Sequence, residues 1–129
     1  MMNILSCLHV QQTAGMDRGV FTSAPIPAGT IIETSPVVVM SGQDRILLDQ
    51  TALHDYIFEW GEEGGQCCMA LGYIAVYNHS FEANCEYEMD YESRSISIRC
   101  VRAIEAGEEL FVNYNGDWNN ATELWFKAK

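Results

Sequence analysis

The chain has 129 residues, of which 48% are hydrophobic, and its 18 acidic side chains outnumber 7 Lys and Arg to give a formal net charge of −11. This length predicts a single domain over residues 1–129, with enough apolar side chains for a core. The excess of acid argues against direct binding of nucleic acid or of an anionic membrane, because both require clustered basic side chains. A negative field attracts a Lys-rich peptide or a cationic small molecule, although acidity also serves solubility alone.

The five cysteines indicate reduced, mostly buried thiols, because their number is odd and none forms a Cys-x-x-Cys pair. No cluster of His, Cys and carboxylates stands out, so we expect no metal. The first ten residues lack the basic leader and long apolar run of a signal peptide, and no run reaches the length that crosses a membrane. We therefore expect an intracellular protein, cytoplasmic or nuclear.

Many short strands joined by Gly, Pro and Asn turns predict a mainly β domain. In chain order, the strands are expected over residues 4–10, 30–33, 37–40, 55–60, 86–91, 95–101 and 109–113. Pro36 cannot donate to a ladder, so we expect it at a strand start or an edge. Gly19 permits a close backbone approach or a positive φ. Residues 43–53 are ambiguous, and residues 68–77 have room for one helical turn.

Residues 77–85 form the most polar junction of the chain. Asn78, His79, Ser80 and Asn84 can all bond the backbone, which is how Asn and Ser side chains close local turns. The residues by themselves therefore predict a tightly held turn between two core segments.

Three separated stretches share one family resemblance, which spans nearly the whole chain. They are Arg18-Gly19-Val20-Phe21 with Ile26-Pro27-Ala28-Gly29-Thr30, Asn78-His79-Ser80 with Asn84, and Ile104-Glu105-Ala106-Gly107-Glu108-Glu109-Leu110 with Tyr114. In this order and spacing they resemble the opening, central and closing motifs of SET-domain protein lysine methyltransferases. The subgroup that the chain most resembles is that of the minimal, viral-type SET proteins. These lack the flanking pre-SET and post-SET cysteine clusters, so the resemblance also implies no zinc.

The resemblance implies a SET-domain (β-clip) fold of small twisted sheets, with the C-terminal segment threaded under a preceding loop as a pseudoknot. It implies S-adenosyl-L-methionine as cofactor and methylation of a lysine in a basic peptide segment, such as a histone tail of chromatin. Candidates for an acidic rim around that peptide, or for an ordinary solvated face, are Glu62, Glu63, Glu86, Glu88 and Asp90. Homodimerisation would complete the peptide groove of so small an enzyme.

Three tyrosines are implied to line the lysine channel as catalytic residues. Tyr114 matches the tyrosine beside the methyl group, Tyr87 an aromatic that limits how many methyl groups fit, and Tyr56 a third wall residue. Tyrosine suits such a wall because it has a flat apolar body and a polar tip. An apolar channel also lowers the pKa of an entering lysine, which favours the neutral nucleophile. The alternative for each is a tyrosine of the core or the surface.

The resemblance also implies a set of cofactor-binding residues, namely Asp17, Arg18, Gly19, Asn78, His79, Tyr114 and Trp125. Residues 17–19 would meet the cofactor with their backbone, Asn78 would bond its methionine part, and the His79 backbone its adenine. Trp125 would stack on the adenine, or it is a plain core residue. Two other functions stay open: a scaffold module that keeps the fold without turnover, and a methyltransferase of a non-histone protein.

Overall fold

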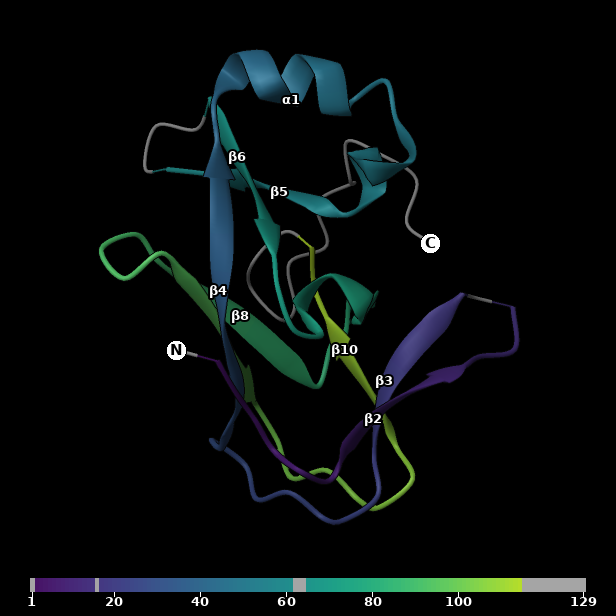
Figure 1. Ribbon diagram of the computed structural model, residues 1–129. Helices are drawn as coiled ribbons and strands as arrows, with labels where there is room; N and C mark the ends of the chain where they lie inside the picture. Colours follow the sequence, from purple (N-terminus) through teal and green to yellow (C-terminus); the bar gives the residue numbers. More distant parts are fainter. Residues whose placement is uncertain (1, 16, 62–64, 115–129) are drawn as a thin grey trace.

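The computed structural model describes residues 2–15, 17–61 and 65–114. Short strands dominate it, as Figure 1 shows, so the predicted mainly β class is confirmed. The strands are β1 Asn3–Ile4, β2 Leu8–Gln12, β3 Arg18–Thr22, β4 Ile31–Met40, β5 Ile57–Trp60, β6 Gln66–Ala70, β7 Asn78–His79, β8 Cys85–Asp90, β9 Ser95–Cys100 and β10 Glu109–Val112. The helical elements are α1 Gly42–Leu48 and the 3₁₀ turns η1 Ala52–Asp55 and η2 Ile74–Val76.

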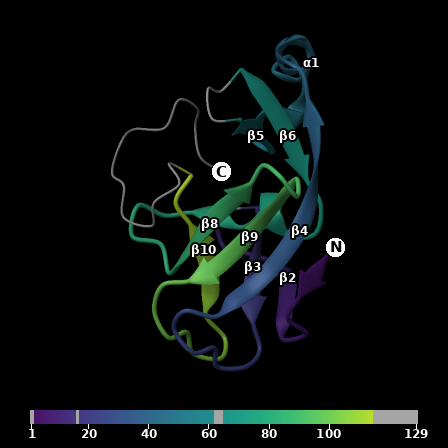
Figure 2. The same ribbon diagram turned by 90° about the vertical axis from the view of Figure 1, so that its left-hand side faces the viewer.

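The strands form two sheets. The larger has the order β5-β6-β4-β9-β8, with β1 added beside β4, and the second has the order β2-β3-β10-β7. Figure 2 shows β8, β9 and β4 side by side. The hairpin expected over residues 86–101 is confirmed as β8 and β9, which pair from Cys85 with Cys100 to Asp90 with Ser95.

Strand β4 corrects the prediction of two strands separated around Pro36. It is one strand of ten residues, paired with β9 along one edge up to Pro36. Its other edge pairs first with β1 and then, from Val37 onward, with β6. The Pro36 carbonyl accepts from the Leu71 amide at 3.0 Å on the β6 side. Because the amide and carbonyl of one strand residue face the same edge, the missing N–H of Pro36 falls where the ladder passes from β1 to β6.

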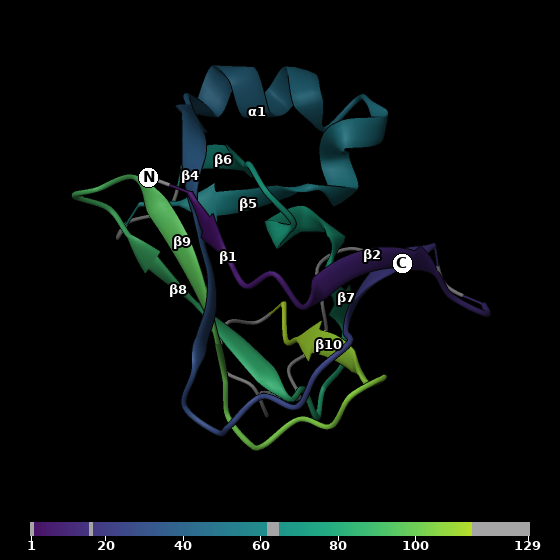
Figure 3. The same ribbon diagram turned by 60° about the horizontal axis from the view of Figure 1, so that its bottom comes forward.

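The single strand predicted over residues 4–10 is also wrong, because the chain turns within it. The Leu8 amide donates to the Leu5 carbonyl at 3.1 Å. This turn sends β1 to the edge of β4 and β2 to the second sheet beside β3, as Figure 3 shows. A polar turn, Ser6-Cys7, interrupts the apolar run that suggested one strand.

The ambiguous stretch 43–53 is α1 followed by η1. A capping box starts α1: the Ser41 hydroxyl accepts from the Asp44 amide at 3.1 Å, and the Asp44 carboxylate accepts from the Ser41 amide at 3.3 Å. No residue of α1 is buried. Within the described residues, no helix is long and apolar enough to span a bilayer.

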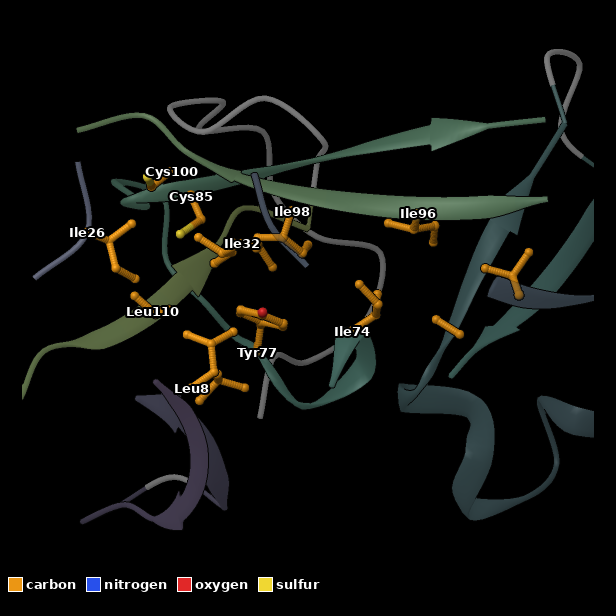
Figure 4. Close-up of a cluster of buried hydrophobic side chains, with 14 of the residues drawn as sticks. Leu8, Ile26, Ile32, Ile74, Tyr77, Cys85, Ile96, Ile98, Cys100 and Leu110 are labelled. Atoms are coloured by element: carbon orange, nitrogen blue, oxygen red, sulfur yellow. The ribbon is translucent and has the colours of Figure 1, made fainter. Parts of the chain in front are cut away.

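The hydrophobic core draws side chains from both sheets. Figure 4 shows Tyr77 among Leu8, Ile32, Ile98 and Leu110, and its ring is fully buried. All five cysteines are free thiols and four of them are buried, as the sequence predicts. Tyr77, which directly precedes β7, is therefore anchored in the centre of the domain.

Candidate active site

Strand β10 brings the three motif stretches together on one sheet. It lies between β3 and β7, with Leu110 opposite Val20 and Phe111 opposite Asn78. The pairing of β10 with β7 is parallel, and the Ser80 amide extends it by donating to the Val112 carbonyl at 3.1 Å. The threading of the segment after residue 114, expected as a pseudoknot, lies outside the described residues and stays a prediction.

Asn84 fastens the loop after β7 to β10. Its side chain is almost fully buried, and its Nδ2 donates to the Glu109 carbonyl at 2.9 Å. Its Oδ1 accepts from the Phe111 amide at 2.8 Å. This one amide therefore bonds β10 as a neighbouring strand would, and the predicted tightly held turn is confirmed.

Asn78 is fully buried, and its amide nitrogen has two partners. Nδ2 donates to the Glu109 carboxylate at 2.8 Å and to the Arg18 carbonyl at 3.2 Å. A Cβ on Gly19 would collide with both the Glu109 carboxylate and the Asn78 amide. The close backbone approach expected of Gly19 is thus confirmed, and Arg18, Gly19, Asn78 and Glu109 form one cluster.

Two buried polar atoms beside this cluster have no hydrogen-bond partner among the described residues: Asn78 Oδ1 and His79 Nε2. Oδ1 is an acceptor that lacks a donor. His79 Nδ1 accepts from the Tyr114 amide at 3.0 Å, so the ring proton resides on Nε2, which is a donor that lacks an acceptor. Burial lowers the pKa of His79, which favours this neutral ring. Because buried polar atoms are normally paired, the two atoms fit a polar ligand that both donates and accepts.

Tyr114 lies against His79, with ring centroids 5.0 Å apart. Its hydroxyl donates to the Tyr77 carbonyl at 2.8 Å. Burial raises the pKa of Tyr114, and negative charge on Tyr56, Asp55 or Tyr87 would raise it further. The phenol is therefore neutral at physiological pH.

The structure brings the other two predicted tyrosines to Tyr114. The Tyr87 hydroxyl donates to the Tyr114 carbonyl at 3.1 Å, and its ring meets Phe58 edge-on at 5.5 Å. Tyr56 is the half-buried residue that ends η1, and it is close enough to Tyr114 to influence its pKa. Residues from three other parts of the chain thus lie around the Tyr114 side chain.

Asp17 and Trp125 are the remaining predicted site residues. Asp17 is exposed just before β3, and its carbonyl accepts from the Thr13 hydroxyl at 2.7 Å. Its contact with a cofactor stays a prediction. Trp125 lies outside the described residues. Across the described ranges, no group of three or more His, Cys, Asp or Glu is placed to hold a metal ion.

Sequence reasoning misses two parts of the site: the Glu109 carboxylate and the Tyr77 carbonyl. An acidic residue inside a short strand, next to the buried Leu110, is the signal that could have singled out Glu109. The ring of Tyr77 packs in the core. Its carbonyl left no signal, because every residue carries one.

Comparison with known proteins places these observations in a family. The SET domain family matches residues 17–115. A histone-lysine N-methyltransferase of Schizosaccharomyces pombe, specific for lysine 37 of histone H3, is 37% identical over 125 residues, which cover 96% of this chain and 80% of that protein. The histone-lysine N-methyltransferase SETD7 of Halocynthia roretzi is 33% identical over 72 residues, which cover 48% of this chain and 18% of that protein.

Solved structures share the fold. A Plasmodium falciparum protein, provisionally assigned as a histone methyltransferase, superimposes with a TM-score of 0.63 at 22% identity and covers 86% of this chain and 99% of its own. A humanized mutant of the Chaetomium thermophilum Polycomb Repressive Complex 2, bound to an inhibitor, gives a TM-score of 0.68 at 21% identity, over 84% of this chain and 14% of that chain. At these identities the likeness concerns the fold alone. The family match and the Schizosaccharomyces relative go further, because they extend over most of the sequence. The chain therefore belongs to the SET domain family of lysine methyltransferases.

Proposed function

We propose that this methyltransferase uses S-adenosyl-L-methionine to methylate a lysine in a basic protein segment, and that a histone tail is its substrate. One observation carries the proposal: the unpaired atoms of Asn78 and His79 adjoin the tyrosine group around Tyr114. The hydrogen bond from the Tyr114 amide to His79 Nδ1 links the two. A polar ligand at the first group and a lysine at the second would meet at Tyr114.

The unpaired atoms fit the amino-acid end of the cofactor. Asn78 Oδ1 would accept from the ammonium group, and His79 Nε2 would donate to the carboxylate. Glu109 and the Gly19 backbone would hold the Asn78 amide in the required orientation. When bound, S-adenosyl-L-methionine supplies a methyl group on a positively charged sulfur.

The tyrosines would position the lysine amine for in-line attack. Because the Tyr114 hydroxyl donates to the Tyr77 carbonyl, it offers the substrate its oxygen as an acceptor. Its raised pKa keeps the phenol protonated, so Tyr114 is not the base that deprotonates lysine. The aromatic surroundings lower the lysine pKa instead, and the proton leaves to solvent before transfer. Most of the rate would come from holding the reacting atoms in line.

Charge supports a basic substrate. The net charge of −11 favours a Lys-rich segment over an acidic one. Two of the five candidate rim residues have other partners: Glu86 pairs with Arg99 at 2.7 Å, and Asp90 accepts from the backbone of its own turn. The name of the Schizosaccharomyces relative makes histone H3 the first substrate to test, and such a substrate would make the protein nuclear.

Labelled transfer to recombinant histone H3, followed by mass spectrometry of its lysines, tests the proposal. Tyr114→Phe retains the ring but loses the hydroxyl, so we expect a rate about a hundredfold lower. Its cofactor affinity, measured by calorimetry, should stay within about threefold, because the bonds to Asn78 are untouched. Tyr91→Phe removes an exposed hydroxyl from the turn after β8 and serves as the matched control with unchanged rate.

Two outcomes would contradict the proposal. Wild-type turnover in Tyr114→Phe would remove this hydroxyl from the mechanism. If the folded wild-type protein binds no S-adenosyl-L-methionine and labels no lysine in H3 or in other basic proteins, the chain is a scaffold and not an enzyme of this kind.

A further inference from the structure

Glu33 is a buried acid that the chemistry described above does not use. It lies within β4 and is 1% exposed. Three donors converge on its carboxyl group: the Ser35 hydroxyl at 2.7 Å, the Tyr73 amide at 2.8 Å and the Tyr77 hydroxyl at 2.8 Å. Burial raises the pKa of Glu33, while these three bonds act in the opposite direction. An acid in an apolar core is costly unless it is hydrogen-bonded, so this arrangement calls for a reason.

The bonds of Glu33 hold both ends of one short segment. Tyr73 precedes the 3₁₀ turn η2, and Tyr77 follows it. Oε2 accepts from the backbone at the first end, and Oε1 accepts from the side chain at the second. Gly72 has a φ of 66°, and a Cβ there would collide with the Glu33 carboxylate and the Ser35 hydroxyl. The backbone that enters η2 is thus pressed against the acid.

The far end of this segment reaches the tyrosine group. The Tyr77 carbonyl accepts the Tyr114 hydroxyl at 2.8 Å, and the next residue, Asn78, starts β7. Tyr77 therefore bonds Glu33 through its side chain and Tyr114 through its main chain. A shift of the Tyr77 ring toward or away from Glu33 would move the carbonyl that orients the Tyr114 hydroxyl.

We propose that Glu33 is a positioning residue for methyl transfer, acting through Tyr77 on the orientation of the Tyr114 hydroxyl. The proposal rests on the role of Tyr114 given under the proposed function. If Glu33 only compensated buried polar groups of the core, its loss would lower stability and leave the geometry of Tyr114 unchanged. A buried acid and its donors can be replaced together by apolar groups without loss of stability, so stability by itself is a weak reason for the presence of Glu33.

Tyr77→Phe is the sharpest test, because it keeps the ring and cuts only the bond to Glu33. Small misplacements at a reacting centre slow catalysis up to about a hundredfold, and we expect kcat to fall about tenfold. The dissociation constant for S-adenosyl-L-methionine should stay within about twofold, because the Asn78 amide keeps its partners. Glu33→Gln should lower kcat in the same direction. Thr34→Val is the control: it removes a similar bond from the opposite face of β4, where the Thr34 hydroxyl meets that of Ser97 at 2.9 Å.

A double-mutant cycle separates positioning from general damage. If Tyr77 acts through the Tyr114 hydroxyl, Tyr77→Phe should change the single-turnover rate less than about twofold in a Tyr114→Phe background. A tenfold loss in both backgrounds, or a normal kcat in Tyr77→Phe, overturns the proposal. Thr34→Val should retain the wild-type kcat whatever its effect on the melting temperature.

A readout without turnover keeps this test apart from the proposed activity. In protein labelled with ¹³C at tyrosine Cζ, the Tyr114 resonance should shift or broaden in Tyr77→Phe and in Glu33→Gln, and should stay unchanged in Thr34→Val. An unchanged Tyr114 resonance in Tyr77→Phe overturns the coupling even if the enzyme is active. If the wild-type protein methylates nothing, the proposed function fails, while the resonance still reports whether Glu33 and Tyr114 are linked.

Discussion

Replacing Gly19 by Ala places one methyl group in the cluster that holds Asn78. The new Cβ would collide with the Glu109 carboxylate and the Asn78 amide nitrogen. The Glu109 carboxylate is the nearer of the two groups, so we expect it to be the one that moves. We therefore expect Gly19→Ala to break the 2.8 Å bond between Glu109 and Asn78, leaving the amide only its longer bond to the Arg18 carbonyl.

The size of this effect follows from the kind of bond that is lost. A hydrogen bond to a charged group contributes about 1.5–3 kcal/mol. If about 2 kcal/mol of it is expressed in the orientation of the Asn78 side chain, the affinity for S-adenosyl-L-methionine falls roughly thirtyfold. Any part of this bond energy that does not affect binding should appear as a lower free energy of unfolding. The two measurements together therefore set limits on the energy lost with the bond.

Calorimetry with S-adenosyl-L-methionine and denaturant unfolding give both quantities. Gly15→Ala is the matched control in the same hairpin: a Cβ there meets nothing within 4 Å, but the φ of 88° is strained for Ala. It should lose about 1 kcal/mol of stability and no affinity. Glu109→Ala removes the group that the new methyl meets, so the losses of Gly19→Ala and Glu109→Ala should not add. Wild-type affinity and stability in Gly19→Ala would refute this account of the cluster.

Three further predictions concern the same site. The pKa of His79 is lowered in the folded protein, so the unfolded chain takes up its proton first as the pH falls. The contribution of His79 to stability is therefore complete above pH 6.5 and is lost as the pH falls from there through the folded pKa. Melting temperatures across this range should show the loss, and His79→Asn should abolish it. Asn84→Ala loses two buried hydrogen bonds to β10 and should lower the free energy of unfolding by about 2–3 kcal/mol, and an unchanged denaturation midpoint would contradict its role as a strand substitute. Tyr87→Phe loses the bond to the Tyr114 carbonyl and opens space for a larger amine, so mass spectrometry should detect more highly methylated lysine. The same product distribution as wild type would count against Tyr87 as a limit on methyl number.

The sequence predicted the local parts of the fold better than their boundaries. Alternating residues identified the β8–β9 hairpin, because pairing between neighbouring strands leaves a period of two in the sequence. Pro36 was misleading because its effect depends on which edge of β4 its missing N–H faces, and this is set by distant strands. The turn at Leu5–Leu8 was hidden by apolar residues on both of its sides.

The candidate site was predictable where a motif carried it and hidden where long-range contacts did. The motif residues Gly19, Asn78, His79 and Tyr114 do gather around β7 and β10. The contacts of Glu33, by contrast, reach across forty residues of chain to Tyr73, and no local pattern records them. Carbonyl groups such as that of Tyr77 are the same in every residue, so only the folded structure reveals which one is used.

The central place of β10 in its sheet has a consequence for the order of folding. Its neighbours β3 and β7 lie far upstream in the sequence and are synthesised before it. Glu109 lies opposite Phe21, and Phe111 lies opposite Asn78. Pairings so distant in sequence are slow to form, because a long loop must close before any contact rewards it. During synthesis the hairpins can form early, whereas Asn78 and His79 acquire their surroundings only after Val112 has emerged. A nascent chain from which β10 has not yet emerged therefore lacks the strand that surrounds the proposed cofactor site.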